Sequence, residues 1–172
     1  MIYYFKTEHL LPVSIDEAWD FFSSAKNLAR ITPPEMDFKI LSNLDEKEIY
    51  EGMIIDYIVK PAFGIPLKWQ TEIINVNKPH SFADKQLKGP YKIWEHTHTF
   101  IQQGNGILMQ DEIKYQIPFG IIGQIAHSLF VREKVKDIFR FREKALDKIF
   151  GTSKQGSVFS GLLNNFNPSY PT

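Results

Sequence analysis

The sequence predicts an α+β protein in which a curved antiparallel sheet of about seven strands wraps around one long C-terminal helix. Alternating polar and apolar residues at 2–11 indicate a first strand, and short β-rich runs fill the middle of the chain. From Gly120 the apolar residues recur every three or four positions until Gly151, which indicates one long amphipathic helix, either continuous or broken near its start. A curved antiparallel sheet must cover its apolar face, and only this helix is long enough to do so.

Two short helices are expected directly after the first strand. Ser14 and Glu17 form the S-x-x-E pattern of a capping box, in which the serine hydroxyl accepts a hydrogen bond from a backbone amide and the glutamate reaches back to residue 14. A second helical piece covers residues 27–31. It ends at Thr32 because a residue that precedes proline avoids the helical region of backbone space.

The remaining strands are expected in β-rich runs that turn residues separate. The runs are residues 38–44, 53–59, 67–76, 82–87, 91–101 and 107–117. The dipeptide Asn105-Gly106 predicts a hairpin between the last two runs. If the turn occupies residues 105–106, His98 pairs with Ile113, and if it occupies residues 104–105, His98 pairs with Asp111. Both pairings keep the same side chains on the same face of the sheet.

Composition limits the classes of function. The chain has 172 residues, with 20 basic and 20 acidic side chains, so it lacks the basic footprint of a nucleic-acid-binding protein. It has no cysteine, which excludes disulfides, thiolate nucleophiles and iron–sulfur clusters and fits a cytoplasmic location. No apolar run approaches the roughly 20 residues that span a bilayer. No P-loop, G-x-G-x-x-G or G-x-S-x-G motif is present.

Two regions differ in composition. Residues 1–150 are expected to form one domain. Residues 151–172 are rich in Gly, Ser, Asn and Pro and are expected to form a tail, whose apolar residues offer a contact for a homo-oligomer.

One face of the predicted hairpin combines aromatic, imidazole and carboxylate side chains. Strand alternation places on this face Trp94, His96, His98, Phe100, Met109, Asp111, Ile113 and Tyr115. The opposite face, which includes Tyr91 and Glu95, is expected to point to water. The same parity turns Trp69, Thr71 and Ile73 inward. If Phe82 is also inward, two polar side chains, Asp84 and Gln86, come with it.

Asp111 is unusual among the apolar residues of this inner face. An unpaired buried charge costs several kcal/mol, so we expect a hydrogen-bonded pair with His98 or His96. A concave face with aromatics and a few convergent polar groups is typical of a ligand pocket. The expected ligand contacts are Trp69, Thr71, Phe82, Trp94, His96, His98, Phe100, Met109, Asp111 and Tyr115.

Two other interpretations of these polar residues stay open. They can be satisfied members of a packed core. Two histidines and one aspartate are also the ligand set of a facial-triad metal centre, but H-x-H in a strand is a weak signal for metal. The sequence therefore predicts no metal and no cofactor.

Several stretches together resemble the START-like, or SRPBCC, superfamily of helix-grip proteins, which includes birch-pollen-allergen-like and polyketide cyclase/dehydratase relatives. The stretches are LPVSIDEAWDFFSSAKNLARITPPEMDFKI, FGIPLKWQTEI, FADKQLKGPYKIWEHTHTF, MQDEIKYQIPFGIIGQIAHSLFV and IFRFRE. The resemblance covers about residues 1–150 and is most specific in GPYKIWEHTHTF. It implies a helix-grip fold with a mostly apolar cavity between the sheet and the C-terminal helix. It also implies binding of a hydrophobic or amphipathic small molecule, lipid- or polyketide-like, without implying a reaction.

Three functions follow as hypotheses. The first is a binding protein for a small hydrophobic ligand. The second is an enzyme of the cyclase or dehydratase type, in which His96 or His98 with Asp111 acts as general acid and base. The third is an interaction protein whose own side chains fill the cavity, so that no pocket of roughly 300 Å³ or more exists.

Overall fold

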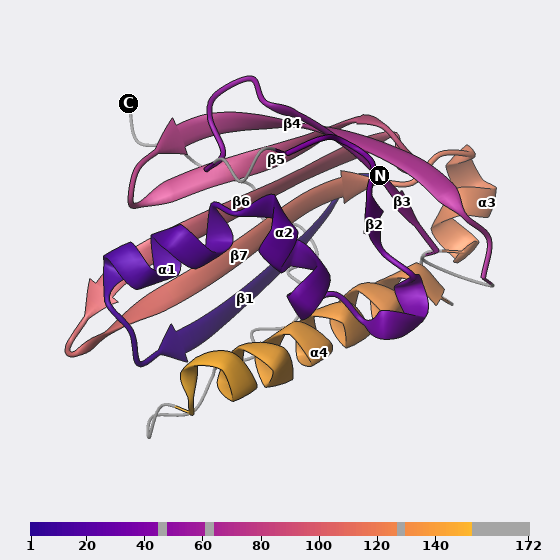
Figure 1. The fold of residues 1–172 in the computed structure, drawn as a ribbon. Coiled ribbons are helices and arrows are strands. Elements are labelled where there is room, and N and C mark those ends of the chain that lie inside the picture. Colours follow the sequence, from indigo (N-terminus) through magenta and orange to yellow (C-terminus); the bar gives the residue numbers. More distant parts are fainter. Residues whose placement is uncertain (45–47, 61–63, 127–129, 153–172) are drawn as a thin grey trace, which may run out of the picture.

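A computed structural model of the protein describes residues 1–44, 48–60, 64–126 and 130–152. Its central feature is one antiparallel sheet in the order β1-β7-β6-β5-β4-β3-β2 (Figure 1). The strands are β1 (Tyr3–Leu11), β2 (Lys39–Ile40), β3 (Ile54–Val59), β4 (Leu67–Asn77), β5 (Ser81–Lys88), β6 (Ile93–Gln103) and β7 (Gly106–Gln116). The predicted α+β class and the strand-rich middle of the chain are confirmed.

The helices are α1 (Ile15–Phe22), α2 (Ala25–Leu28), the 3₁₀ turns η1 (Ala29–Ile31) and η2 (Pro34–Met36), α3 (Gly120–Ala126) and α4 (Arg132–Phe150). Of these, α1, α2 and α4 lie on one side of the curved sheet, with α4 running across it, whereas α3 lies apart at one end of the sheet (Figure 1). The C-terminal helix is therefore divided near its start, one of the two forms expected. Among the described residues, no helix is long and apolar enough to cross a membrane.

The predicted capping box starts α1. The amide of Ser14 donates to Glu17 Oε2 at 2.9 Å, and the amide of Glu17 donates to Ser14 Oγ at 3.3 Å. These bonds satisfy backbone donors that the first turn of a helix leaves without partners. They fix the direction in which α1 leaves the sheet, so that Trp19 is buried against the aromatic rings of Phe82 and Phe100.

The hairpin register places a histidine opposite a carboxylate. Gln103 pairs with Gly106, so the turn occupies residues 104–105, and His98 lies opposite Asp111. Gly104 has a φ of 59°, in the left-handed region that glycine reaches at little cost. The second of the two predicted turn positions is therefore the correct one.

Two strand boundaries were predicted wrongly. The strand expected over 38–44 covers only Lys39–Ile40, because the amides of Leu41 and Ser42 both donate to the carbonyl oxygen of Asp56, at 2.8 and 3.4 Å. Two donors on one acceptor end the regular ladder.

The strand expected to start at Tyr91 starts at Ile93. The side chain of Gln86 makes two hydrogen bonds to the backbone of Tyr91, at 2.7 and 3.3 Å, in place of strand pairing.

The core fills the space between the concave face and the helices. One buried cluster lies under α1 and includes Trp19, Phe22 and Phe100, and a second lies between β1, β7 and α4 and includes Phe5 and Phe139. The predicted tail and its oligomer contact lie outside the described residues, apart from residues 151–152.

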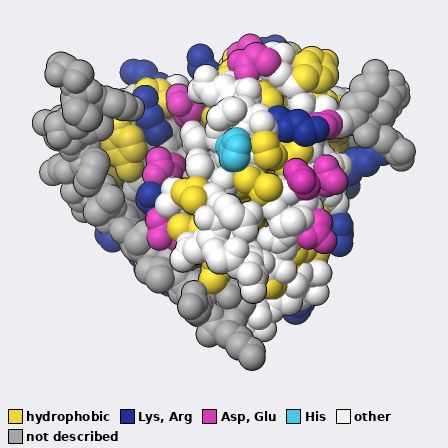
Figure 2. Space-filling model, turned by 90° about the vertical axis from the view of Figure 1, so that its left-hand side faces the viewer, with side chains coloured by type: hydrophobic (Ala, Val, Ile, Leu, Met, Phe, Trp, Pro, Cys, Tyr) yellow, Lys and Arg dark blue, Asp and Glu magenta, His cyan; other side chains and the backbone are white. Residues whose placement is uncertain are grey.

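Charged side chains of both signs occur on the face of the molecule that Figure 2 shows. Figure 2 shows acidic and basic side chains interspersed on the side of the molecule where α1 lies.

Candidate ligand-binding site

A cavity of about 170 Å³ lies between the concave face of the sheet and the helices. Strands β3 to β6 form its sheet wall, and α1, α2, η1, η2 and α4 contribute the opposite wall. Most lining side chains are aliphatic or aromatic, among them Phe22, Leu28, Ile55 and Ile138. The described residues therefore leave an open space between sheet and helix, whose volume lies below the roughly 300 Å³ that defines the third hypothesis.

The predicted ligand contacts divide into two groups. Six line the cavity: Trp69, Thr71, Phe82, Trp94, His96 and His98. Four do not line it, although all four are buried: Phe100, Met109, Asp111 and Tyr115. The helices explain the difference. Phe22 of α1 covers Phe100 with ring centroids 5.3 Å apart, and α4 packs over the cluster that contains Tyr115.

Among the lining residues that the sequence prediction did not name as ligand contacts are three with polar groups: Tyr57, Tyr91 and Arg142. Tyr91 was placed on the water-facing side, but its ring lies 4.7 Å from that of Trp94 and 5.6 Å from that of Trp69. The prediction extended the alternation of β6 to residue 91, where the backbone has already left the strand.

A buried polar network forms one part of the cavity wall and the layer behind it. Asp111 Oδ1 lies 2.8 Å from His96 Nε2, 2.9 Å from His98 Nδ1 and 3.2 Å from Arg142 Nη1. The contact with His96 is a well-aligned hydrogen bond, whereas His98 approaches the same oxygen obliquely. The expected Asp–His pair is present, and both histidines share it.

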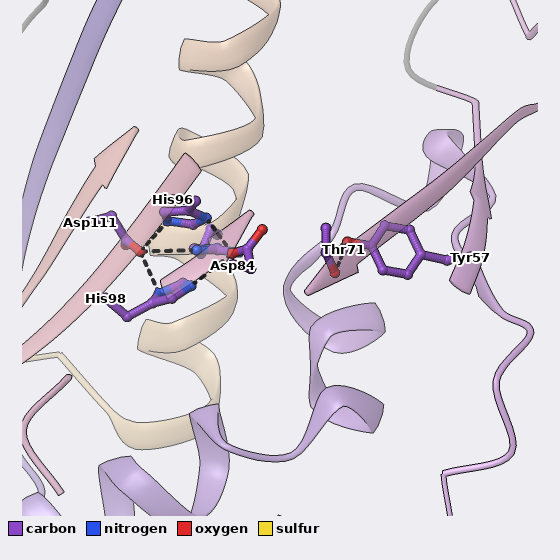
Figure 3. A network of polar contacts seen from close by, with 7 residues as sticks. Tyr57, Thr71, Asp84, His96, His98 and Asp111 are labelled. Atoms are coloured by element: carbon purple, nitrogen blue, oxygen red, sulfur yellow. Dashed lines mark hydrogen bonds and ion pairs between the residues drawn. The ribbon is translucent and has the colours of Figure 1, made fainter. Parts of the chain in front are cut away.

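A second carboxylate lies on the other side of the two imidazole rings. Asp84 Oδ2 is 3.5 Å from His96 Nδ1 and 3.6 Å from His98 Nε2. Figure 3 shows the two rings between Asp111 and Asp84, with the ring centroids 4.0 Å apart. Asp84 comes from β5, the histidines from β6 and Asp111 from β7, so three neighbouring strands build the network.

The network shifts the pKa of each member. Burial opposes ionisation of Asp111, but the Arg142 guanidinium and the hydrogen bond from His96 hold the pKa of Asp111 well below its usual range. Burial also opposes ionisation of Asp84, yet its contacts with His98 and His96 lower its pKa. Burial lowers the pKa of His96, and the neighbouring His98 lowers it further. Burial disfavours protonated His98 too, but Asp111 and Asp84 outweigh that effect and raise the pKa of His98.

A second polar group lies farther along the cavity. Tyr57 Oη and Thr71 Oγ1 are 2.9 Å apart, and Figure 3 shows this pair away from the histidines, beyond Asp84. Close to this pair in the wall, the ring of Trp69 packs against that of Tyr57 in a tilted arrangement, with ring centroids 6.3 Å apart. The buried indole nitrogen of Trp69 has no hydrogen-bond partner among the described residues.

The fold is that of helix-grip proteins. A START superfamily protein from Mycobacterium smegmatis superposes with a TM-score of 0.62 at 12% sequence identity, over 86% of this chain and 97% of that one. The ginseng major latex-like protein 151 from Panax ginseng superposes with a TM-score of 0.63 at 12% sequence identity, over 87% of this chain and 98% of that one. Norcoclaurine synthase from Thalictrum flavum, a point mutant solved with a transition-state analogue, gives 0.61 at 16% identity, over 87% and 96%. No family model matches the sequence, and no curated protein matches it.

A larger protein contains a similar domain. The nucleoside-diphosphate sugar epimerase from Corynebacterium glutamicum superposes with a TM-score of 0.56 at 22% identity, over 83% of this chain but only 28% of that one. At these identities the comparisons establish the fold, a helix-grip sheet around a C-terminal helix, and leave the activity to be argued from the site.

Proposed function

We propose that this protein binds a small hydrophobic or amphipathic molecule in the cavity between the sheet and α4. The cavity of about 170 Å³, which the described side chains leave open, carries the proposal. The indole nitrogen of Trp69 adds to it: a buried donor without an acceptor costs about 1–3 kcal/mol, and a ligand oxygen that reached it would remove that cost. The surrounding wall is mostly apolar, so the rest of the ligand is apolar as well.

The size of the cavity limits the ligand. A volume of about 170 Å³ is below the roughly 300 Å³ of drug-sized sites but close to that of an engineered cavity of about 150 Å³ that binds benzene. The cavity therefore suits a compound with one ring and a polar substituent. A larger lipid- or polyketide-like molecule requires the helices to move away from the sheet.

Native mass spectrometry of freshly purified protein, followed by denaturation of the same sample, tests the proposal. We expect an extra organic mass that is released on unfolding. Ile55→Trp places a large ring in the cavity and should remove this mass, whereas Ile58→Trp, on the other face of the same strand, should retain it. If the protein carries no mass, p-cresol is titrated into all three proteins and the melting temperature is followed. Equal responses of both variants would show that the cavity is not the binding site.

A second function, acid–base catalysis on the bound molecule, is favoured by one arrangement. His96 and His98 both line the cavity, and Asp111 lies behind them at 2.8 and 2.9 Å, as a carboxylate that orients a general base does. This function predicts chemical conversion of the ligand, with loss of turnover but not of binding in His98→Gln. Recovery of an unchanged ligand after long incubation with the wild-type protein would argue against it.

A further inference from the structure

We propose that Asp84, His96 and His98 form a binding site for a divalent transition-metal ion, of which Zn²⁺ is the model. This site goes beyond the binding of an organic ligand and does not depend on it. Each of the three side chains offers one ligand atom, and these atoms lie within 4.8 Å of one another. Two imidazoles and one carboxylate are a common ligand set for such ions.

The two distances to Asp84 match a coordination sphere better than a pair of hydrogen bonds. Asp84 Oδ2 lies 3.5 Å from His96 Nδ1 and 3.6 Å from His98 Nε2, beyond the usual limit of roughly 3.2 Å for a hydrogen bond. In a tetrahedral zinc site with bonds of 2.0–2.2 Å, neighbouring ligand atoms lie about 3.3–3.6 Å apart. The Asp84 contacts therefore fall at the separation that a shared ion produces.

The outer contacts orient the same nitrogens. A carboxylate accepts hydrogen bonds, so His96 Nε2 at 2.8 Å from Asp111 is the protonated nitrogen of that ring. In a neutral ring the other nitrogen, Nδ1, then carries a lone pair, and it faces Asp84. His98 places Nδ1 2.9 Å from Asp111, at the oblique angle described above, and Nε2 toward Asp84. A carboxylate that holds the outer nitrogen of a ligating histidine is the usual support of a metal site.

The charges of the described residues leave room for a cation. The positive charge of Arg142 balances the negative charge of Asp111. Among the residues that the structure describes, Arg142 is the one arginine or lysine in contact with Asp84 or Asp111. Asp84 is mostly buried and has the two imidazoles as its ion-pair contacts among the described residues, while the charge of Arg142 reaches it only as a smaller contribution. A proton or a metal ion between these three groups removes the mismatch. All three also line the cavity, so a fourth coordination position is directed to the place where a ligand would lie.

The test is a titration of tag-free, EDTA-treated protein with Zn²⁺ alone at neutral pH, by calorimetry, with metal content after dialysis as a second measure. We expect one ion per chain. Asp84→Asn should weaken binding at least tenfold, because it removes the anionic ligand. Asp111→Asn should weaken it by about 10–100-fold through the orientation of the imidazoles.

His9→Ala is the matched control, since His9 also pairs with a carboxylate, at 3.2 Å from Asp147, but belongs to no such cluster. It should leave the affinity for Zn²⁺ unchanged. Co²⁺ added to the unmodified protein should give the strong visible absorption of a four-coordinate ion, which does not depend on any variant folding. The proposal is overturned if the wild type takes up no stoichiometric metal, if Asp84→Asn binds Zn²⁺ as well as the wild type, or if His9→Ala alone removes binding.

Discussion

Replacement of Arg142 by methionine should destabilise the protein by about 3 kcal/mol. Arg142 Nη1 lies 3.2 Å from Asp111 Oδ1, with side-chain exposures of 8% and 6%. At an effective dielectric constant of about 20, two unit charges at this distance attract each other by about 5 kcal/mol. Desolvation offsets part of this attraction in the intact pair, but loss of one partner leaves a buried charge and costs about 3–5 kcal/mol. The two histidines still contact Asp111, so the lower end applies.

The assay is urea unfolding at pH 7 with a metal chelator present, followed by tryptophan fluorescence. Arg140→Met is the matched control on the same helix. Arg140 pairs with Asp137 at 2.9 Å, but both side chains are more than half exposed, so the cost should stay below about 1 kcal/mol. In the double variant Asp111→Asn/Arg142→Met the two charges disappear together, and the cost should be well below the sum of the single variants. The reasoning is wrong if Arg142→Met costs no more than Arg140→Met.

Two further predictions concern an ionisable group in the cavity wall and a glycine. Burial, with a smaller contribution from the charge of Asp84, raises the pKa of Tyr57. The protonated Tyr57 side chain therefore contributes fully to stability below about pH 10, and this contribution is lost as the pH rises above the pKa of the tyrosine in the unfolded chain. The free energy of unfolding should therefore fall less steeply above pH 10 in Tyr57→Phe, by up to about 1.4 kcal/mol per pH unit, and equal slopes would contradict this. A Cβ at Gly106 would overlap the carbonyl oxygen of Leu11, so Gly106→Ala should cost about 1–3 kcal/mol in urea unfolding. Gly104 has open space around it, so Gly104→Asn should destabilise the protein less than Gly106→Ala does. A larger loss of stability in Gly104→Asn than in Gly106→Ala would refute the argument.

The inner face of the hairpin could be predicted because strand alternation has a period of two. That period alone places His96, His98 and Asp111 on one face, whatever the turn. The exact pairing could not be derived, because glycines at both 104 and 106 allow either turn. The structure selects the pairing in which Gly104 adopts positive φ.

Arg142 shows where the sequence carried more information than the prediction used. It lies on α4 at the same helical face as Val135, Phe139 and Leu146, at spacings of four, three and four residues. An arginine within an apolar stripe indicates a buried partner carboxylate, which is Asp111 here.

Tyr91 is different. Its place in the cavity depends on two hydrogen bonds between its backbone and the Gln86 side chain, which no periodicity reveals.

The polar and the apolar surfaces of the site come from different elements. Strands β5, β6 and β7 and one arginine of α4 supply the charged and imidazole groups. The short helices and β3 supply mostly aliphatic and aromatic surface, for example Phe22, Leu28 and Ile55. Substitutions in these two surfaces act nearly independently when they share no contacts. The volume of the cavity can therefore be redesigned through the aliphatic positions without disturbing the chemistry at the histidines, which makes this small domain a scaffold for receptors of chosen size.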